Sequence, residues 1–273
     1  MVDNSIIVPT YNEKNPYLSV VIPAYNEEKR IKDSLTETCA AFDSFPISYE
    51  IIVVNDGSTD RTFEEASTIA QKRNNVKVVH YTKNGGKGNA VRYGCKFVTG
   101  NFVTFLDADL ELHPKQLKGF IESMKKYDMD IVVGSKRHPF SKVNYPYHRK
   151  ILSWFYHLLI KMIFNLPVND TQVGLKLFKR GVIDTVIPKM LVKRYAYDVE
   201  LLVIAKRLGF KMMEAPIELN FTRKIGRIRL TDIRKIANDT AAIFYRMHIL
   251  KYYDQKHEQN QIMIFPEKNE VPA

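Results

Sequence analysis

The chain of 273 residues contains only two cysteines, Cys39 and Cys95, and no Cys-x-x-Cys spacing. This scarcity argues against a disulfide framework or a cysteine-based zinc site and favours two free thiols in a reducing compartment. A membrane-spanning helix needs about 18 or more apolar residues. The nearest candidate, residues 151–168, is interrupted by His157 and Lys161. We therefore expect no transmembrane helix, and the start of the chain predicts no signal peptide.

Two glycine signatures of nucleotide binding are also missing. The segment Asn84–Asn89 places glycines beside Lys87 but lacks the Gly-Lys-Ser/Thr of a Walker A loop. The first strand-to-helix turn, Pro23–Glu27, lacks the glycines of a dinucleotide fingerprint, which disfavours a Rossmann dehydrogenase. The composition, with 45% hydrophobic residues, is instead that of a globular chain with a sizeable core.

The net charge of +11 is concentrated in the second half of the chain. Residues 1–141 carry 18 basic and 18 acidic side chains, whereas residues 142–273 carry 23 basic and 12 acidic ones. This asymmetry predicts an anionic partner, such as a phosphate or a lipid head group. A nucleic-acid-binding protein is the alternative, but no such module is recognisable, so we expect no nucleic acid partner.

Strand patterns alternate with helical patterns along the first half. Apolar runs predict strands over 18–23, 49–54, 76–80, 102–106 and 131–133, and helices over 27–42, 60–73, 86–98 and from Pro114. The second half predicts strands over 174–178 and 210–214, and helices over 147–166, 198–208 and 231–245. The alternation predicts an α/β fold with a mostly parallel sheet, which binds its ligands at the carboxyl ends of the strands.

The segment Ile6–Lys14 is a near-copy of Val20–Glu28, and only the second copy is followed by an amphipathic helix. We therefore predict an N-terminal extension over residues 1–16. Residues 17–255 are expected to form one domain, with a nucleotide-sugar half (17–140) and an acceptor and membrane half (141–255), before a flexible tail (256–273).

Acidic residues follow two of the predicted strands. Asp107 and Asp109 are one residue apart, so their side chains point the same way and could hold Mg²⁺ or Mn²⁺. The alternative is a solvated turn. Asp56 ends another strand before Gly57, where we expect an exposed carboxylate that accepts hydrogen bonds from a base or a ribose. The glycines around Lys87 could let backbone N–H groups approach a phosphate.

Together, the segments Leu18–Glu28, Asn55–Ser58, Gly86–Gly88 and Asp107–Asp109 resemble family 2 glycosyltransferases with the GT-A fold. The later segments Asp170–Arg180 and Tyr195–Leu202 resemble the polyprenyl-phosphate sugar synthases. Within that group, they are closer to the dolichyl-phosphate β-glucosyltransferases than to the mannose enzymes. The resemblance covers about residues 17–250.

The resemblance implies roles for particular residues. The expected nucleotide-sugar site comprises Pro23, Ala24, Tyr25, Glu27, Val54, Asp56, Lys87, Asp107, Ala108, Arg223 and Arg229. The expected metal ligands are Asp107, Asp109 and Glu111, for Mg²⁺ or Mn²⁺. The expected acceptor residues are Arg137, Arg149, Ser153, Gln172 and Asp198, and the catalytic residues are Asp109, Arg149 and Lys136. For Gln172 and Asp198 a role in supporting the fold is equally open, and the cations over 223–235 could simply form a solvated face.

The implied reaction is an inverting transfer of a hexose, with UDP-glucose favoured, onto a polyprenyl or dolichyl phosphate. The aromatic-rich segment 147–166 could be a buried helix or one lying in a membrane interface. We expect a peripheral protein on the cytoplasmic face of a membrane, with a membrane protein as a further candidate partner. The alternatives are a GDP-mannose-dependent dolichyl-phosphate mannose synthase and a family 2 enzyme with a soluble acceptor. The latter would need a base, which Asp198 or Glu200 could supply.

Overall fold

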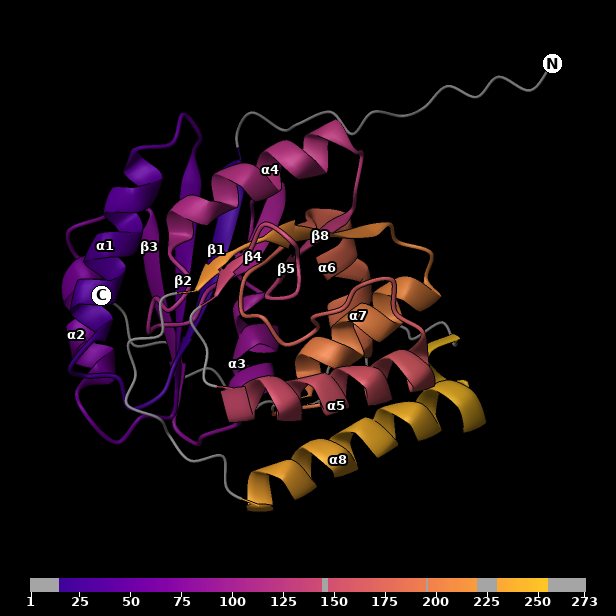
Figure 1. Cartoon of the computed structure of the whole chain (residues 1–273). Helices are drawn as coiled ribbons and strands as arrows, with labels where there is room; N and C mark the ends of the chain where they lie inside the picture. The colour runs from indigo at the N-terminus through magenta and orange to yellow at the C-terminus, as the bar shows by residue number, and fades with distance from the viewer. Residues whose placement is uncertain (1–14, 144–146, 195, 220–229, 255–273) are drawn as a thin grey trace.

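A seven-stranded sheet forms the centre of the molecule (Figure 1). The structure, a computed structural model, describes residues 15–143, 147–194, 196–219 and 230–254. The strand order is β3-β2-β1-β4-β7-β5-β8. The strands are β1 (Leu18–Ala24), β2 (Tyr49–Asp56), β3 (Val76–Tyr81), β4 (Phe102–Phe105), β5 (Ile131–Ser135), β7 (Lys176–Lys179) and β8 (Met212–Pro216).

Six of the seven strands run parallel, which confirms the predicted α/β fold with a mostly parallel sheet. The exception is β7, which pairs antiparallel with both β4 and β5. The register aligns Leu18 of β1 with Tyr49 of β2 and with Phe102 of β4. Because these three strands start level and run parallel, the loops that follow them meet at one edge of the sheet.

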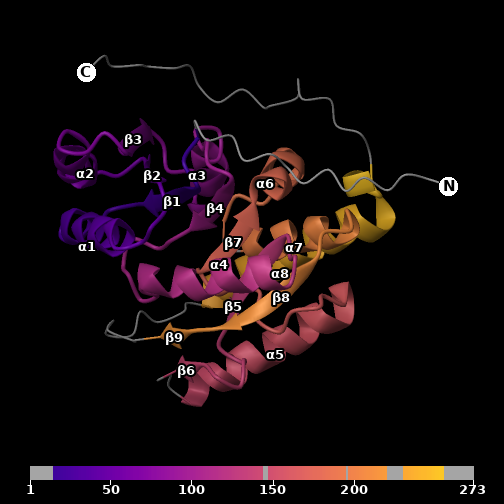
Figure 2. The ribbon, with the colours of Figure 1, turned by 90° about the horizontal axis from the view of Figure 1, so that it is seen from above.

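Helices cover both faces of the sheet (Figures 1 and 2). Side chains of α1 (Ile31–Asp43), α2 (Thr62–Ala70) and α4 (Leu117–Lys126) share one apolar core with one face of the strands. The other core contains side chains of α3 (Lys87–Gly94), α5 (Tyr147–Phe164), α6 (Arg180–Val186), α7 (Tyr197–Arg207) and α8 (Leu230–Phe244). Alternate residues of β1 belong to the two cores, as the period of two in a strand requires.

Several elements differ from the sequence prediction. The helix expected over 86–98 ends at Gly94, and the one expected from Glu27 begins at Ile31. A short parallel pair, β6 (Lys142–Val143) and β9 (Glu218–Leu219), was not predicted; it lies near the start of α5 (Figure 2). A π-helical turn, Tyr245–Ile249, follows α8 directly. Strands of two residues are too short to leave a periodic pattern.

Close packing of α3 on the sheet depends on Gly94. A Cβ atom at this position would lie 2.5 Å from Val21 Cγ1 and 2.8 Å from Val54 Cγ2. We predict that Gly94→Ala lowers the free energy of unfolding by about 1–3 kcal/mol through overpacking, measured by urea denaturation. Gly119→Ala in α4 is the matched control, because nothing lies within 4 Å of its added methyl group. It should be neutral or stabilise by up to about 1 kcal/mol, and equal effects of the two substitutions would contradict the packing explanation.

Candidate active site

The carboxylate of Asp56, at the end of β2, organises the glycine-containing segment. Oδ1 accepts hydrogen bonds from Tyr81 Oη (2.6 Å) and Gly85 N (2.7 Å). Oδ2 accepts them from Asn84 Nδ2 and Gly86 N, both at 3.0 Å. Burial, followed by the hydrogen bond to Asp56, raises the pKa of Tyr81 well above its usual range, so its hydroxyl stays protonated and donates. The three bonds from Asn84, Gly85 and Gly86 fix residues 84–86 over the end of the strand.

This arrangement corrects the expectation of an exposed carboxylate at Asp56. The residue is only 3% exposed, and its four hydrogen bonds match the roughly four acceptor positions of a carboxylate. Asp56 still borders the cavity described below, but it acts on the backbone around it. The donors lie 25–30 residues away along the chain, so no local pattern reveals them.

Asp107 and Asp109 follow β4 at the same edge of the sheet. Asp107 forms an ion pair with Lys87, the first residue of α3. Although burial alone would lower the pKa of Lys87, the attraction of Asp107 raises it, so the side chain is a cation at neutral pH. On its other side Asp107 fits against Gly174, where an added Cβ atom would lie 2.6 Å from its Oδ2. Gly174 therefore leaves the space that the carboxylate occupies.

The loop after β1 is tied to the loop after β2. Asn26 adopts a positive φ of 54°, and its backbone N–H donates to Ser58 Oγ at 3.0 Å. Its side-chain oxygen accepts from Thr59 N at 2.9 Å, and Glu27 N donates to Thr62 Oγ1 at 2.8 Å. These bonds hold the neighbouring Tyr25, which is 47% exposed, at the rim of the site.

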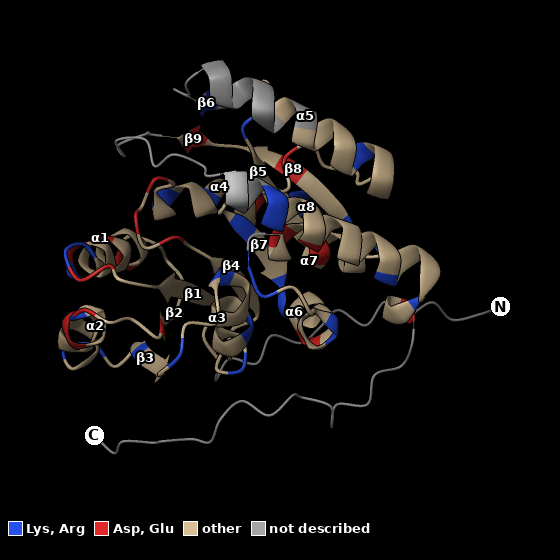
Figure 3. Ribbon diagram, turned by 90° about the horizontal axis from the view of Figure 1, so that it is seen from below, with Lys and Arg blue, Asp and Glu red and all other residues tan. Residues whose placement is uncertain are grey.

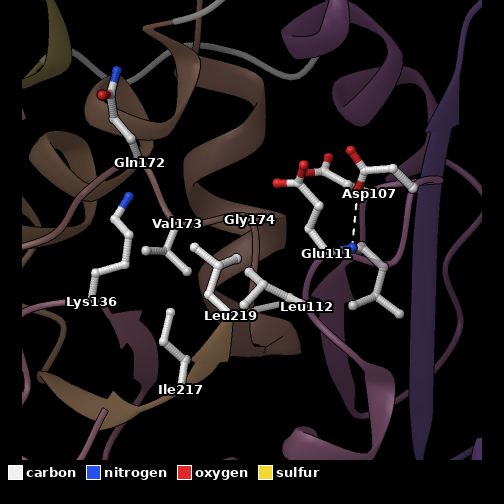
Figure 4. Close-up of a pocket in the computed structure, with 11 residues that line it drawn as sticks. Asp107, Glu111, Leu112, Lys136, Gln172, Val173, Gly174, Ile217 and Leu219 are labelled. Carbon is white, nitrogen blue, oxygen red and sulfur yellow. Dashed lines mark hydrogen bonds between the residues drawn. The ribbon is translucent and has the colours of Figure 1, made fainter. Parts of the chain in front are cut away.

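Two cavities meet at the aspartates. The larger, of about 450 Å³, contains nine of the predicted nucleotide-sugar and metal residues: Pro23, Ala24, Tyr25, Glu27, Asp56, Lys87, Asp107, Ala108 and Asp109. The smaller, of about 180 Å³, is bordered by Asp107, Asp109 and Glu111 and by Lys136 and Gln172. In Figure 4 the carboxylates of Asp107 and Glu111 lie on one side of it and Lys136 and Gln172 on the other. The shared aspartates therefore stand between two spaces that could each receive a ligand.

The two aspartates suit a divalent cation that is shared with a ligand. Across the described ranges, no group of three or more Asp, Glu, His or Cys side chains is placed to hold a metal ion. Glu111 lies in the same cavity, but its backbone N–H donates to Asp109 Oδ1 at 3.2 Å. One or two carboxylates completed by phosphate oxygens and water is the coordination that Mg²⁺ usually adopts. The residues present fit that pattern.

Lys136 is fixed on the far side of the smaller cavity by Asp170. Its ammonium lies 3.4 Å from Asp170 Oδ2, and its backbone N–H donates to the same oxygen at 3.0 Å. Asp170 is 5% exposed. The predicted acceptor residue Arg137 does not border either cavity; its backbone N–H donates to Ser135 Oγ.

Three further candidate residues, two carboxylates and a valine, are buried inside the protein. Asp198 accepts a bond of 2.6 Å from Lys176, and these residues are 6% and 1% exposed. Glu200, at 0% exposure, accepts hydrogen bonds from Leu191 N and Val192 N and from the side chains of Arg246 and Tyr253. Val54 is fully buried in the core and borders neither cavity. For these positions the supporting role explains the geometry.

Four predicted residues remain untested by position. Arg149 and Ser153 belong to α5, but their side chains lie outside what the structure describes, as do Arg223 and Arg229 altogether. Conversely, the larger cavity includes Asn84, Arg194 and Lys235, and the smaller has an apolar wall of Leu112, Val173, Ile217 and Leu219. Lys235 belongs to the basic run that the sequence showed, whereas Arg194 carries no local signal of a role.

Residues 19–187 match the family described as "Glycosyl transferase family 2". This chain belongs to glycosyltransferase family 2. The resemblance to this family predicted from the sequence is thereby confirmed, and the chain is an enzyme of the glycosyltransferase class.

Relatives with sequence similarity cover most of the chain. Dolichyl-phosphate beta-glucosyltransferase ALG5A of Trichomonas vaginalis (strain ATCC PRA-98 / G3) is 36% identical over 273 residues, which cover 91% of this chain and 83% of the relative. Dolichyl-phosphate beta-glucosyltransferase of Dictyostelium discoideum is 30% identical, over 82% of this chain and 69% of the relative. The resemblance to the dolichyl-phosphate glucosyltransferase group is therefore confirmed at the level of sequence.

Solved structures share the fold. Glucosyl-3-phosphoglycerate synthase from Mycobacterium tuberculosis, in complex with Mn²⁺, UDP and glucosyl-3-phosphoglycerate, has a TM-score of 0.63 at 20% identity and covers 85% of this chain and 80% of its own. Mannosyl-3-phosphoglycerate synthase from Rubrobacter xylanophilus has a TM-score of 0.62 at 16% identity, covering 89% and 77%. The predicted GT-A architecture is confirmed.

The buried pair of Lys176 and Asp198 predicts a stability effect. Removing one partner leaves an uncompensated buried charge, so Asp198→Ala should lower the free energy of unfolding by about 3–5 kcal/mol. The double variant Lys176→Met/Asp198→Leu should recover most of this loss, because apolar residues of similar size often replace a buried pair without cost. Urea denaturation measures both. An Asp198→Ala protein of wild-type stability would contradict the supporting role and favour the predicted acceptor role.

The paired aspartates predict a metal-binding effect. We expect Asp109→Asn to weaken Mn²⁺ binding at least about tenfold, because ligand charge sets affinity for a hard cation. Titration calorimetry with UDP present measures it. Glu122→Gln on α4, which removes an exposed carboxylate that borders neither cavity, is the control. Unchanged Mn²⁺ affinity in Asp109→Asn would remove this aspartate from the metal site.

Proposed function

We propose that the enzyme transfers glucose from UDP-glucose onto a polyprenyl phosphate such as dolichyl phosphate. The observation that carries the proposal is the meeting of two cavities at Asp107 and Asp109, one of nucleotide size and one with a lysine and an apolar wall. The relatives named as dolichyl-phosphate beta-glucosyltransferases support this choice of donor sugar and acceptor.

In this proposal the nucleotide occupies the larger cavity, whose volume lies in the usual range for ligand sites. Pro23, Tyr25 and Glu27 border the part of the cavity formed by the loop after β1, and Lys87 stands beside Asp107. Asp107 and Asp109 would hold Mg²⁺ or Mn²⁺, which when bound offsets negative charge on the leaving diphosphate. Lys87 contributes a positive charge to the same region.

The acceptor phosphate would enter the smaller cavity beside Lys136 and Gln172, with its first isoprene carbons against Ile217 and Leu219. A phosphate oxygen attacks the anomeric carbon, the bond to the diphosphate breaks, and the nucleoside diphosphate leaves. Such an oxygen is already ionised at neutral pH, so no strong base is needed. A soluble acceptor that reacts through a hydroxyl group would need Asp198 or Glu200 as a base. Both carboxylates are instead buried and bonded to other groups of the protein, which supports the phosphate acceptor.

Membrane contact is proposed through α5 and the end of α8. Described side chains there are large, apolar and exposed: Trp154, Leu158, Leu159, Met162, Phe244, Tyr245, Ile249 and Leu250. Tyr156 Oη and Thr240 Oγ1 are 3.2 Å apart, so the two helices pack side by side. The same two helices carry cations, among them Lys161 of α5 and Arg234 of α8. Figure 3 shows Lys and Arg positions on both helices, as expected for a surface that lies on an anionic membrane. Among the described residues, no helix combines the length and apolarity needed to cross a bilayer.

The substrate proposal predicts a lipid product. UDP-glucose and dolichyl phosphate, with Mn²⁺, should give a labelled glucose product that partitions into organic solvent. GDP-mannose should be a poor donor, and 3-phosphoglycerate, a soluble phosphate acceptor, should give little product. Efficient transfer to 3-phosphoglycerate with none to the lipid would contradict the proposed acceptor, and a preference for GDP-mannose would contradict the proposed donor.

The membrane proposal predicts a loss of vesicle binding. Met162, at 73% exposure, should enter the lipid surface. Met162→Asp should weaken binding to anionic vesicles about tenfold or more, because burying such a side chain contributes about 1.5–3 kcal/mol. Flotation with vesicles measures this. Tyr127→Ser removes an exposed aromatic at the end of α4, on the opposite face of the sheet, and should leave binding unchanged.

A further inference from the structure

The segment of residues 190–194 is anchored from beneath by buried Glu200. Glu200 Oε2 accepts hydrogen bonds from Leu191 N (2.9 Å) and Val192 N (2.7 Å). Its other oxygen accepts bonds of 2.7 Å from Arg246 and from Tyr253, in the turns that follow α8. A fully buried carboxylate with four donors is a rigid attachment point. The segment is therefore held in place before any ligand binds.

The anchored segment packs directly against the first turn of α3. Asn89 N donates to Lys193 O at 3.0 Å. Cβ atoms added at Gly86 and Gly88 would lie 2.7 Å from Lys193 O and 2.9 Å from Val192 O. Glycine at both positions is what allows the two segments to approach so closely. Gly86 also has a positive φ of 88°, which disfavours any other residue there.

This close approach brings Arg194 to the larger cavity. Its Cγ lies 3.0 Å from the Cβ position at Gly86, and the residue borders the cavity together with Lys87. The side chain is exposed, so its guanidinium is hydrated and available to a ligand. Lys87, by contrast, is already paired with Asp107.

We propose that Arg194 binds the diphosphate of the donor nucleotide. The inference rests on the proposed function, since it needs a nucleoside diphosphate in the larger cavity. The diphosphate is the anionic part of a nucleotide-sugar. Its oxygens can accept the hydrogen bonds that the planar guanidinium group of an arginine donates in pairs. Arg194 then holds the donor while its sugar is transferred, and it stabilises the leaving group afterwards. Burial raises the pKa of Asp239 on α8, and the charges of Arg246 and Arg194 act against this shift, so an interaction of Arg194 with Asp239 is a purely structural alternative.

The test compares a charged ligand with its uncharged part. Titration calorimetry of the full chain with UDP and with uridine, in the presence of Mn²⁺, gives the ratio of their dissociation constants. Arg194→Ala should weaken UDP binding about 10–100-fold, the range of charge-assisted hydrogen bonds, and leave uridine binding unchanged. Arg194→Lys should restore part of the loss. Lys193→Ala is the matched control, because it removes an exposed cation from the same segment without touching the cavity.

The outcomes distinguish the role of Arg194 from the choice of UDP-glucose as donor. Wild-type UDP affinity in Arg194→Ala would overturn the assignment, as would an equal loss of uridine and UDP affinity, the result expected from a structural role with Asp239. A wild-type protein that binds no UDP would overturn the proposed donor as well. The thermal unfolding midpoint of each variant confirms that the compared proteins are folded.

Discussion

Four hydrogen bonds to the carboxylate of Asp56 set the geometry on which the rest of the site depends. Three of them bend residues 84–86 back over the end of β2, and α3 begins directly after this segment. Lys87, the first residue of α3, is thereby delivered to Asp107 at the end of β4. Gly86, at the end of this segment, and Gly88 leave room for the segment that carries Arg194. A single buried carboxylate thus fixes the ends of β2 and β4 and the start of α3 relative to one another.

The proposed chemistry explains why the site alternates in charge. Two phosphorylated substrates repel each other, so each needs positive charge on its own side. Lys87 and Arg194 border the larger cavity, and Lys136, oriented by Asp170, borders the smaller. The aspartates between these cations are negatively charged. They border both cavities, where they could bind a divalent metal together with a diphosphate. Behind the site, the buried ion pair of Lys176 and Asp198 joins β7 to α7.

The sequence was most informative where a pattern is local. Short apolar runs predicted β1 to β5, because each run is followed by a turn. The direction of β7 was beyond reach, since a buried antiparallel strand between two others has the same apolar pattern as a parallel one. Asp107 and Asp109 were found because one-residue spacing puts both on one side. The burial of Asp56 and the position of Arg194 depend on contacts between segments far apart in the chain, which leave no periodic signal.

The most direct test of the proposed function is a crystal structure of the enzyme with UDP-glucose and Mn²⁺. We expect the uridine in the cavity bordered by Tyr25 and Glu27, and the diphosphate with the metal at Asp107 and Asp109. The anomeric carbon of the glucose should face the smaller cavity and Lys136. A nucleotide bound elsewhere, or a glucose directed away from Lys136, would contradict it.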